Sequence, residues 1–140
     1  MKKTAVISAM LLLMLIFSQS VYAGGSKEES AVTSSGSWLS LVDNEDYSGS
    51  WKQAAGYFRN AVTEDQWANS MKSFRKPLGR ALTREIISKQ YMTSLPGAPD
   101  GEYVVIQYST SFENKKSAVE TVTPMLDKDN IWRVSGYFIK

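Results

Sequence analysis

The sequence contains no cysteine and no histidine among its 140 residues. Without a thiol, the chain has no disulfide bond, no cysteine nucleophile, no cysteine-linked lipid and no thiolate metal site. Without an imidazole, it has no serine triad of the usual kind, no histidine-based zinc site and no general base of the type most common near neutral pH. The fold must therefore be held together by its core, and any catalysis would have to use carboxylates, tyrosines, lysines or arginines.

The first 23 residues have the pattern of an export signal. Lys2 and Lys3 form a basic start, Ala5–Phe17 is an apolar segment, and small residues precede a cleavage point after Ala23. The apolar segment has about 13 residues, whereas a membrane span needs about 20. We therefore expect export to the periplasm or the extracellular space, cleavage after Ala23, and no stable membrane span in the mature chain.

The mature chain has no excess charge of either sign. The full sequence has 16 basic and 14 acidic residues, and cleavage removes Lys2 and Lys3, which leaves 14 of each. A neutral, exported chain gives little reason to expect nucleic acid as a partner. The remaining 117 residues suit one domain and leave no room for a second.

A polar segment separates the signal from this domain. Residues 24–36 are rich in glycine, serine and charge and contain few apolar side chains. Too little apolar surface is present to offset the entropy of ordering them. This composition predicts a flexible arm over 24–36 and a single domain over 37–140.

A short first helix and a longer second one are expected at the start of the domain. The first begins near Ser37, where apolar residues recur at helical spacing, and ends before the polar run at 43–46. The second begins at Ser50, whose hydroxyl can form a reciprocal capping box with Gln53. The apolar face of this second helix extends to Val62.

A third helix has the clearest start in the chain. Thr63 caps it and Gln66 completes a capping box, and Pro77 should end it because the residue before a proline avoids helical geometry. Aromatic residues at helical spacing are predicted to form the helical half of the core: Trp38, Trp51, Phe58, Trp67 and Phe74.

The second half of the chain has the pattern of a sheet. After Gly79 apolar residues alternate, and β-branched and aromatic types become frequent. Short polar connections imply antiparallel hairpins, which predicts an α+β domain with its helices packed on one face of a curved four-stranded sheet. Which face of each strand meets the helices stays open. The expected strands are Ala81–Thr93, Gly101–Phe112, Ser117–Leu126 and Ile131–Ile139.

An ordered series of motifs lies at 38–43, 47–51, 75–79, 95–103, 118–120 and 132–137. In this order the motifs resemble a bacterial family of exported proteins, catalogued as domain-of-unknown-function family 4019. The resemblance runs from about Ser37 to Lys140. It implies a cone-shaped fold similar to cystatin-like or nuclear-transport-factor-like domains, and it brings no activity and no catalytic or binding residues.

One stretch of the chain carries charge of a single sign. Between Gln66 and Arg84 there is no acidic residue. Lysine and arginine side chains there could dock an anionic ligand, because guanidinium groups suit phosphate or carboxylate. We favour the alternative, that they complement a helix C-terminus and keep the surface soluble. The candidates are Lys72, Arg75, Lys76, Arg80 and Arg84.

Two glutamates, Glu85 and Glu120, fall within expected strands. An inward-facing acid would have a raised pKa and could act as a general base. Alternatively, each glutamate faces solvent or pairs with Arg84 or Arg133 across strands. If there is a catalytic site, its candidates are Glu120 with Tyr103, Tyr108 and Tyr137.

Two acidic clusters, Asp43 with Glu45 and Asp46, and Asp127 with Asp129, raise the possibility of a calcium site. Neither cluster continues with the spacing of an EF-hand loop, and acidic residues in turns usually bond their own backbone. We therefore expect no metal site and no cofactor.

The sequence thus favours a small exported binding or interaction domain of the bacterial cell envelope, whose partner is a small molecule or an envelope protein. Two alternatives stay open: a small-molecule enzyme with a carboxylate and tyrosine site between helices and sheet, and a self-associating structural subunit. A cavity beside a desolvated glutamate would favour the enzyme, a dry cleft beside a flat exposed sheet would favour assembly, and an open polar cleft would favour ligand capture.

Overall fold

The computed structural model describes residues 19–140, with side chains from Gly25 onward. Most of the predicted signal peptide, residues 1–23, lies outside the described residues. The elements follow one another as α1 (Gln19–Asp43), α2 (Tyr47–Lys52), α3 (Gly56–Ala61), α4 (Glu64–Ser70), a π-helical turn (Met71–Arg75), a 3-10 turn (Lys76–Leu78), β1 (Ala81–Met92), β2 (Tyr103–Phe112), β3 (Lys115–Leu126) and β4 (Trp132–Ile139).

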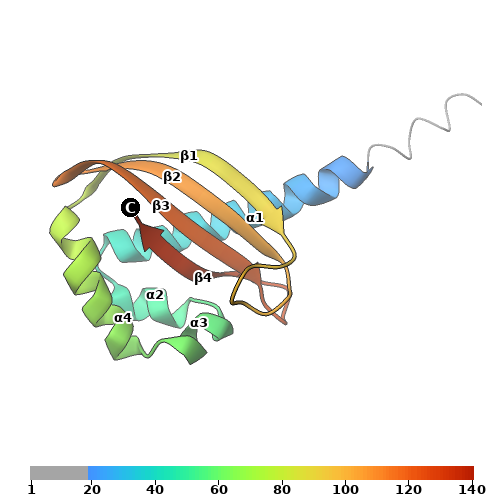
Figure 1. The fold of residues 1–140 in the computed structure, drawn as a ribbon, viewed down its shortest axis with the longest axis horizontal. Coiled ribbons are helices and arrows are strands. Elements are labelled where there is room, and N and C mark those ends of the chain that lie inside the picture. The colour runs from blue at the N-terminus through green and yellow to red at the C-terminus, as the bar shows by residue number, and fades with distance from the viewer. Residues whose placement is uncertain (1–18) are drawn as a thin grey trace, which may run out of the picture.

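The four strands form one antiparallel sheet in the order β1-β2-β3-β4. Each strand begins and ends within two residues of its predicted bounds. The sheet is curved and arches over α1, while α2, α3 and α4 lie on the same side near β4 (Figure 1). The predicted α+β class, with helices followed by an antiparallel sheet, is confirmed.

Helix α1 is much longer than the sequence suggested. The predicted flexible arm over 24–36 is wrong, because these residues are helical and two of them, Ala31 and Ser35, are fully buried. The Ser34 hydroxyl donates to the Trp132 carbonyl at 2.7 Å. Small side chains let the helix lie close to the sheet, and these distant contacts offset the ordering entropy. The start of α1 extends past the sheet (Figure 1).

None of the helices within residues 19–140 is long and apolar enough to cross a membrane.

The predicted helix from Ser50 to Val62 is also wrong. Helix α2 begins earlier, because the Asp46 carboxylate caps it by accepting from the Gly49 N–H at 2.9 Å. The chain then leaves the helix, because the Ala55 N–H donates to the Val134 carbonyl of β4 at 2.8 Å. A second short helix, α3, follows this break.

Helix α4 starts as predicted and ends differently. The Thr63 and Gln66 side chains form both hydrogen bonds of the capping box, at 3.2 and 3.0 Å. The π-helical turn Met71–Arg75 then adds a residue to the turn, so that Arg75 lies inside instead of Phe74. Phe74 is 73% exposed, and its predicted place in the core is wrong.

The helical segment continues slightly past Lys76, where Pro77 was expected to stop it. Pro77 lies in the first turn of the 3-10 helix, where its missing N–H does no harm. Gly79 follows with a φ of +76°, a conformation that favours glycine, and turns the chain into β1.

The aromatic core joins the helices to the sheet. Trp38 and Trp67 lie 5.7 Å apart between ring centroids, and Tyr137 of β4 packs edge-on against both. Phe58 packs against Trp67 at 5.0 Å, and Trp51 is partly buried against the same cluster. Apart from Phe74, the predicted aromatic residues therefore contribute to the core.

The structure shows which face of β2 packs against the helices, a question that the alternating sequence pattern left open. Val104, Ile106 and Tyr108 are all buried in the core beneath α1, whereas Ser109 on the opposite face is exposed.

Both buried indoles of the helical layer bind one residue, Ser50. The Trp38 Nε1–H donates to the Ser50 carbonyl at 2.8 Å, and the Trp67 Nε1–H donates to its hydroxyl oxygen at 2.9 Å. The hydroxyl itself donates to the Tyr47 carbonyl at 2.8 Å. Ser50 is fully buried and links α1, α2 and α4.

We predict that Ser50→Ala lowers the free energy of unfolding by about 1–3 kcal/mol, because it leaves the Trp67 indole N–H buried without an acceptor. Urea denaturation followed by tryptophan fluorescence measures this change. The matched control is Ser40→Ala on the exposed side of α1, which should change stability by less than about 0.5 kcal/mol. Equal effects of the two substitutions would contradict the role given to Ser50.

Candidate functional site

A carboxylate lies at the centre of the sheet's helix-facing side. Glu120 of β3 is fully buried. Its Oε1 accepts from the Arg84 Nε–H at 2.7 Å and from the Thr110 hydroxyl at 2.6 Å, and its Oε2 accepts from the Tyr137 hydroxyl. Both carboxylate oxygens are thus bound by neighbouring side chains.

Arg84 links Glu120 to the end of α1. Its two terminal nitrogens donate to both oxygens of Asp43, at 2.7 and 3.0 Å. Arg75 donates to the same Asp43 carboxylate at 3.1 Å and to the Gly79 carbonyl at 2.6 Å, and its guanidinium lies 4.5 Å from the centre of the Phe112 ring. We call Asp43, Arg75, Arg84, Glu120 and Tyr137 the buried ionic network.

The charges of this network are fixed by its own hydrogen bonds. Burial by itself would raise the pKa of Asp43, but hydrogen bonds from Arg84 and Arg75 hold that pKa below its ordinary value. Burial and the nearby Glu120 carboxylate raise the pKa of Tyr137, which keeps this phenol protonated as a donor. These shifts keep Asp43 ionised and Tyr137 protonated near neutral pH.

Three of the four predicted catalytic residues come together on the helix-facing side. Tyr137 binds Glu120 directly, while the Tyr108 hydroxyl shares a hydrogen bond with the Ser35 hydroxyl at 2.8 Å. Tyr103 lies apart from them and donates to the Pro99 carbonyl at 2.5 Å. Glu85 is exposed.

The arrangement around Glu120 matches the ion-pair alternative weighed from the sequence. Both of its oxygens accept hydrogen bonds from protein side chains, and Glu120 does not line the cleft, the pocket or the groove on the surface of the domain. A general base needs a free oxygen within reach of the proton that it abstracts. In this geometry Glu120 holds β3 to β1 and β4 and, through Arg84, to α1.

We predict that Glu120→Gln lowers the free energy of unfolding by about 3 kcal/mol, because it removes a buried charge and leaves the Arg84 guanidinium with only one carboxylate. Chemical denaturation followed by circular dichroism measures the change. Glu85→Gln, on the exposed face of β1, is the control and should stay within about 0.5 kcal/mol of the unmodified chain. A Glu120 variant as stable as this control would show that the network does not hold the fold together.

Of the five basic residues predicted as an anion patch, Arg75, Lys76 and Arg80 line one pocket together with acidic residues, whereas Lys72 and Arg84 do not line it. Arg75 and Arg84 belong to the buried ionic network. Lys76 and Arg80 are exposed, and each forms an ion pair with a nearby glutamate. Lys72 is exposed on the same segment, but the π-helical turn separates its face from that of Arg75.

Acidic residues of the two clusters considered for a metal site bind protein groups instead. Asp46 caps α2, while Asp127 and Asp129 both bind Arg133. Within residues 19–140, no three side chains of the histidine, cysteine, aspartate or glutamate types lie close enough together to hold a metal ion.

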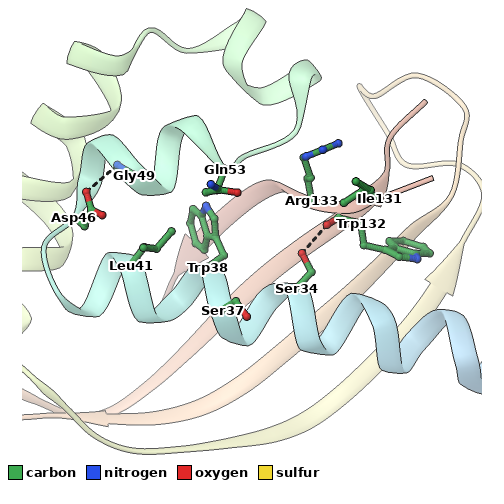
Figure 2. A pocket seen from close by; sticks show the side chains of 10 residues that line it. All are labelled: Ser34, Ser37, Trp38, Leu41, Asp46, Gly49, Gln53, Ile131, Trp132 and Arg133. Carbon is green, nitrogen blue, oxygen red and sulfur yellow. Dashed lines mark hydrogen bonds between the residues drawn. The ribbon is translucent and has the colours of Figure 1, made fainter. Parts of the chain in front are cut away.

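An open cleft of about 560 Å³ lies where α1, α2 and the start of β4 meet. Figure 2 shows side chains from these three segments around the same hollow. We call it the α1–α2–β4 cleft. It is lined by Ser34, Ser37, Trp38 and Leu41 from α1, Asp46, Gly49 and Gln53 from α2 and its two ends, and Ile131, Trp132 and Arg133 from β4 and the residue before it.

The walls of the cleft are mixed in character. Exposed polar groups come from Ser37, Gln53 and Asp46, and an apolar surface comes from Leu41 and Ile131, which is 50% exposed. A few polar groups beside an apolar wall can orient and hold a small molecule. Sequence reasoning missed this cleft, because its lining residues share no motif and meet only after α1 packs on β4.

Two further hollows lie elsewhere on the molecule. A pocket of about 230 Å³ lies beside Arg75 and Tyr47 at the edge of the buried ionic network. A more apolar groove of about 510 Å³ runs between α4 and the end of β4, where Phe74 and Phe138 are exposed.

The comparisons with known proteins give a family and no activity. A family model described as "Protein of unknown function (DUF4019)" matches residues 34–137, which include both the buried ionic network and the α1–α2–β4 cleft. No curated protein matches the chain, and no solved structure matches it.

Proposed function

The chain belongs to the DUF4019 family of proteins of unknown function, and we propose that it is an exported, non-catalytic domain of the cell envelope that binds a small molecule in the α1–α2–β4 cleft. The observation that carries this proposal is the cleft itself. It is open, its volume of about 560 Å³ falls in the range of small-molecule sites, and it offers exposed polar groups beside an apolar wall.

Binding is favoured over catalysis by the state of the buried carboxylates. Glu120 is fully buried and Asp43 is partly buried, and their oxygens accept hydrogen bonds from arginine, threonine and tyrosine donors. None of the residues of the buried ionic network lines the cleft, and the one lining carboxylate is the exposed Asp46. No nucleophile beside a base is found among the residues that line the cleft.

We also propose that the domain has a cone-shaped fold, and its shape supports this part of the proposal. A long helix lies in the concavity of a curved antiparallel sheet (Figure 1), as expected for the cystatin-like or nuclear-transport-factor-like cones that the sequence suggested. Such relationships concern the fold and carry no activity by themselves.

Export is proposed from the basic and apolar pattern of the first 23 residues. Cleavage after Ala23 would shorten α1 to residues 24–43. The buried residues described for this helix, from Ala31 to Val42, would all be kept.

We predict that protein recovered from the periplasmic or extracellular fraction of an expressing bacterium begins at Gly24. Intact-mass spectrometry of the purified chain, compared with the cytoplasmic fraction, measures the N-terminus. An intact chain that begins at Met1 and stays in the cytoplasm would refute the export part of the proposal, but it would leave the cleft untouched.

We predict that filling the cleft abolishes ligand binding without unfolding the domain. The variant is Ser37→Trp, because Ser37 is exposed on α1 and lines the cleft. The probes are a library of small water-soluble fragments, followed by NMR shifts of the Leu41 and Ile131 methyl groups. Fragments that shift these groups in the unmodified protein should no longer do so in the variant.

The matched control is Ser40→Trp, which places the same side chain on the exposed side of the same helix, outside the cleft. It should retain fragment binding, and both variants should keep the thermal midpoint within a few degrees. The proposal fails if no fragment shifts the cleft residues, or if the fragments bind only in the groove beside Phe74 and Phe138.

A further inference from the structure

We infer that the ligand of the α1–α2–β4 cleft is an organic cation, an ammonium group carried on a short apolar stem. This inference rests on the proposed function, since it names the class of molecule that the cleft would take. It follows from which charged groups around the cleft are already neutralised and which are not.

The lining of the cleft contains two charged side chains, Asp46 and Arg133. Arg133 is engaged elsewhere. One of its terminal nitrogens donates to Asp127 at 3.1 Å and to Asp129 at 2.8 Å, and the other donates to Asp129 at 2.8 Å. Such a forked ion pair uses the donor geometry that an anionic ligand would need. An anion entering the cleft would thus meet a guanidinium that already has two carboxylate partners.

Asp46, unlike Arg133, has no partner of opposite charge in the described part of the chain. Its Oδ1 accepts the capping hydrogen bond from the Gly49 N–H at 2.9 Å, and no second donor to this carboxylate is found in the described part of the chain. The side chain is exposed. Its other oxygen can therefore accept from a ligand without disturbing α2, and Figure 2 shows Asp46 at the end of the cleft where α2 begins.

Of the two charges that line the cleft, only the negative one lacks an ionic partner. The Arg133 guanidinium is offset by Asp127 and Asp129, which lie outside the lining, whereas the Asp46 carboxylate forms no ion pair in the described part of the chain. Lys52 and Lys128 are the nearby cations in sequence, but both are exposed and neither lines the cleft. Water and salt screen such exposed charges. A ligand that carries positive charge is the one that improves this balance.

The apolar wall of the cleft favours a ligand whose uncharged part is a hydrocarbon. Leu41, Ile131 and Trp132 line the cleft, and half of the Ile131 surface is exposed. A short hydrocarbon stem would cover this surface and remove it from water. A bare metal ion would leave the apolar wall uncovered, so the arrangement favours an alkyl ammonium group.

The experiment compares three probes with the same five-carbon chain and different charge: cadaverine, pentanediol and glutarate. Each is titrated into the full mature chain at low ionic strength, and the NMR shifts of Leu41 and Ile131 are followed. Cadaverine should bind at least about tenfold more tightly than pentanediol, and glutarate should not bind. Added salt should weaken the binding of cadaverine, because part of the attraction is electrostatic.

The variant Asp46→Asn isolates the charge. Asparagine caps a helix about as well as aspartate, so α2 and the thermal midpoint should be retained while the affinity for cadaverine falls about tenfold. The control is Asp65→Asn, which removes an exposed carboxylate from the first turn of α4, outside the cleft. It should leave the affinity unchanged.

The outcomes separate this inference from the proposed function. If pentanediol or glutarate binds as tightly as cadaverine, or if Asp46→Asn binds cadaverine unchanged, the cationic ligand is ruled out while the cleft stays a binding site. If none of the three probes shifts the cleft residues, the inference is overturned as well, and the fragment titration with Ser37→Trp decides separately whether the cleft binds anything.

Discussion

The pairing of Arg84 with Glu120 and Asp43 is the interaction on which the rest of the structure depends. A fully buried carboxylate would be strongly unfavourable by itself. Here Arg84 reaches from an edge strand to the centre of the sheet and, with its other two nitrogens, to the end of α1. Because one guanidinium binds both carboxylates, the position of the long helix over the sheet is set by the same hydrogen bonds that neutralise Glu120.

The buried ionic network and the α1–α2–β4 cleft are formed by different residues. The titratable groups that an enzyme could use are bound to one another inside the domain, and their oxygens have protein donors. The exposed polar groups of the cleft lie where α1 and α2 meet the start of β4. Two hydrogen bonds to carbonyls of β4 join these segments, from the Ser34 hydroxyl to Trp132 and from the Ala55 N–H to Val134.

Local signals in the sequence were reliable where neighbouring residues provide the stabilising contacts. The Thr63 and Gln66 capping box formed as expected, since both partners lie within one turn. The strands could be placed to within two residues, because alternation and short polar turns are properties of adjacent positions. The prediction failed for Ser50, whose hydroxyl accepts from the distant Trp67 instead of capping a helix. It also failed for the residues that line the cleft, which carry no common pattern.

The sequence by itself determined the class of the domain, its strands, most of its aromatic core, and the exclusion of thiol and imidazole chemistry. Only the tertiary structure decided that residues 24–36 are helical, that Arg75 replaces Phe74 inside, and which polar groups stay exposed around a cleft. The reason is physical. Periodicity and capping act over a few residues, whereas the burial of a serine-rich helix, the phase shift of a π-helical turn and the neutralisation of Glu120 by Arg84 depend on contacts between residues that are far apart in the chain.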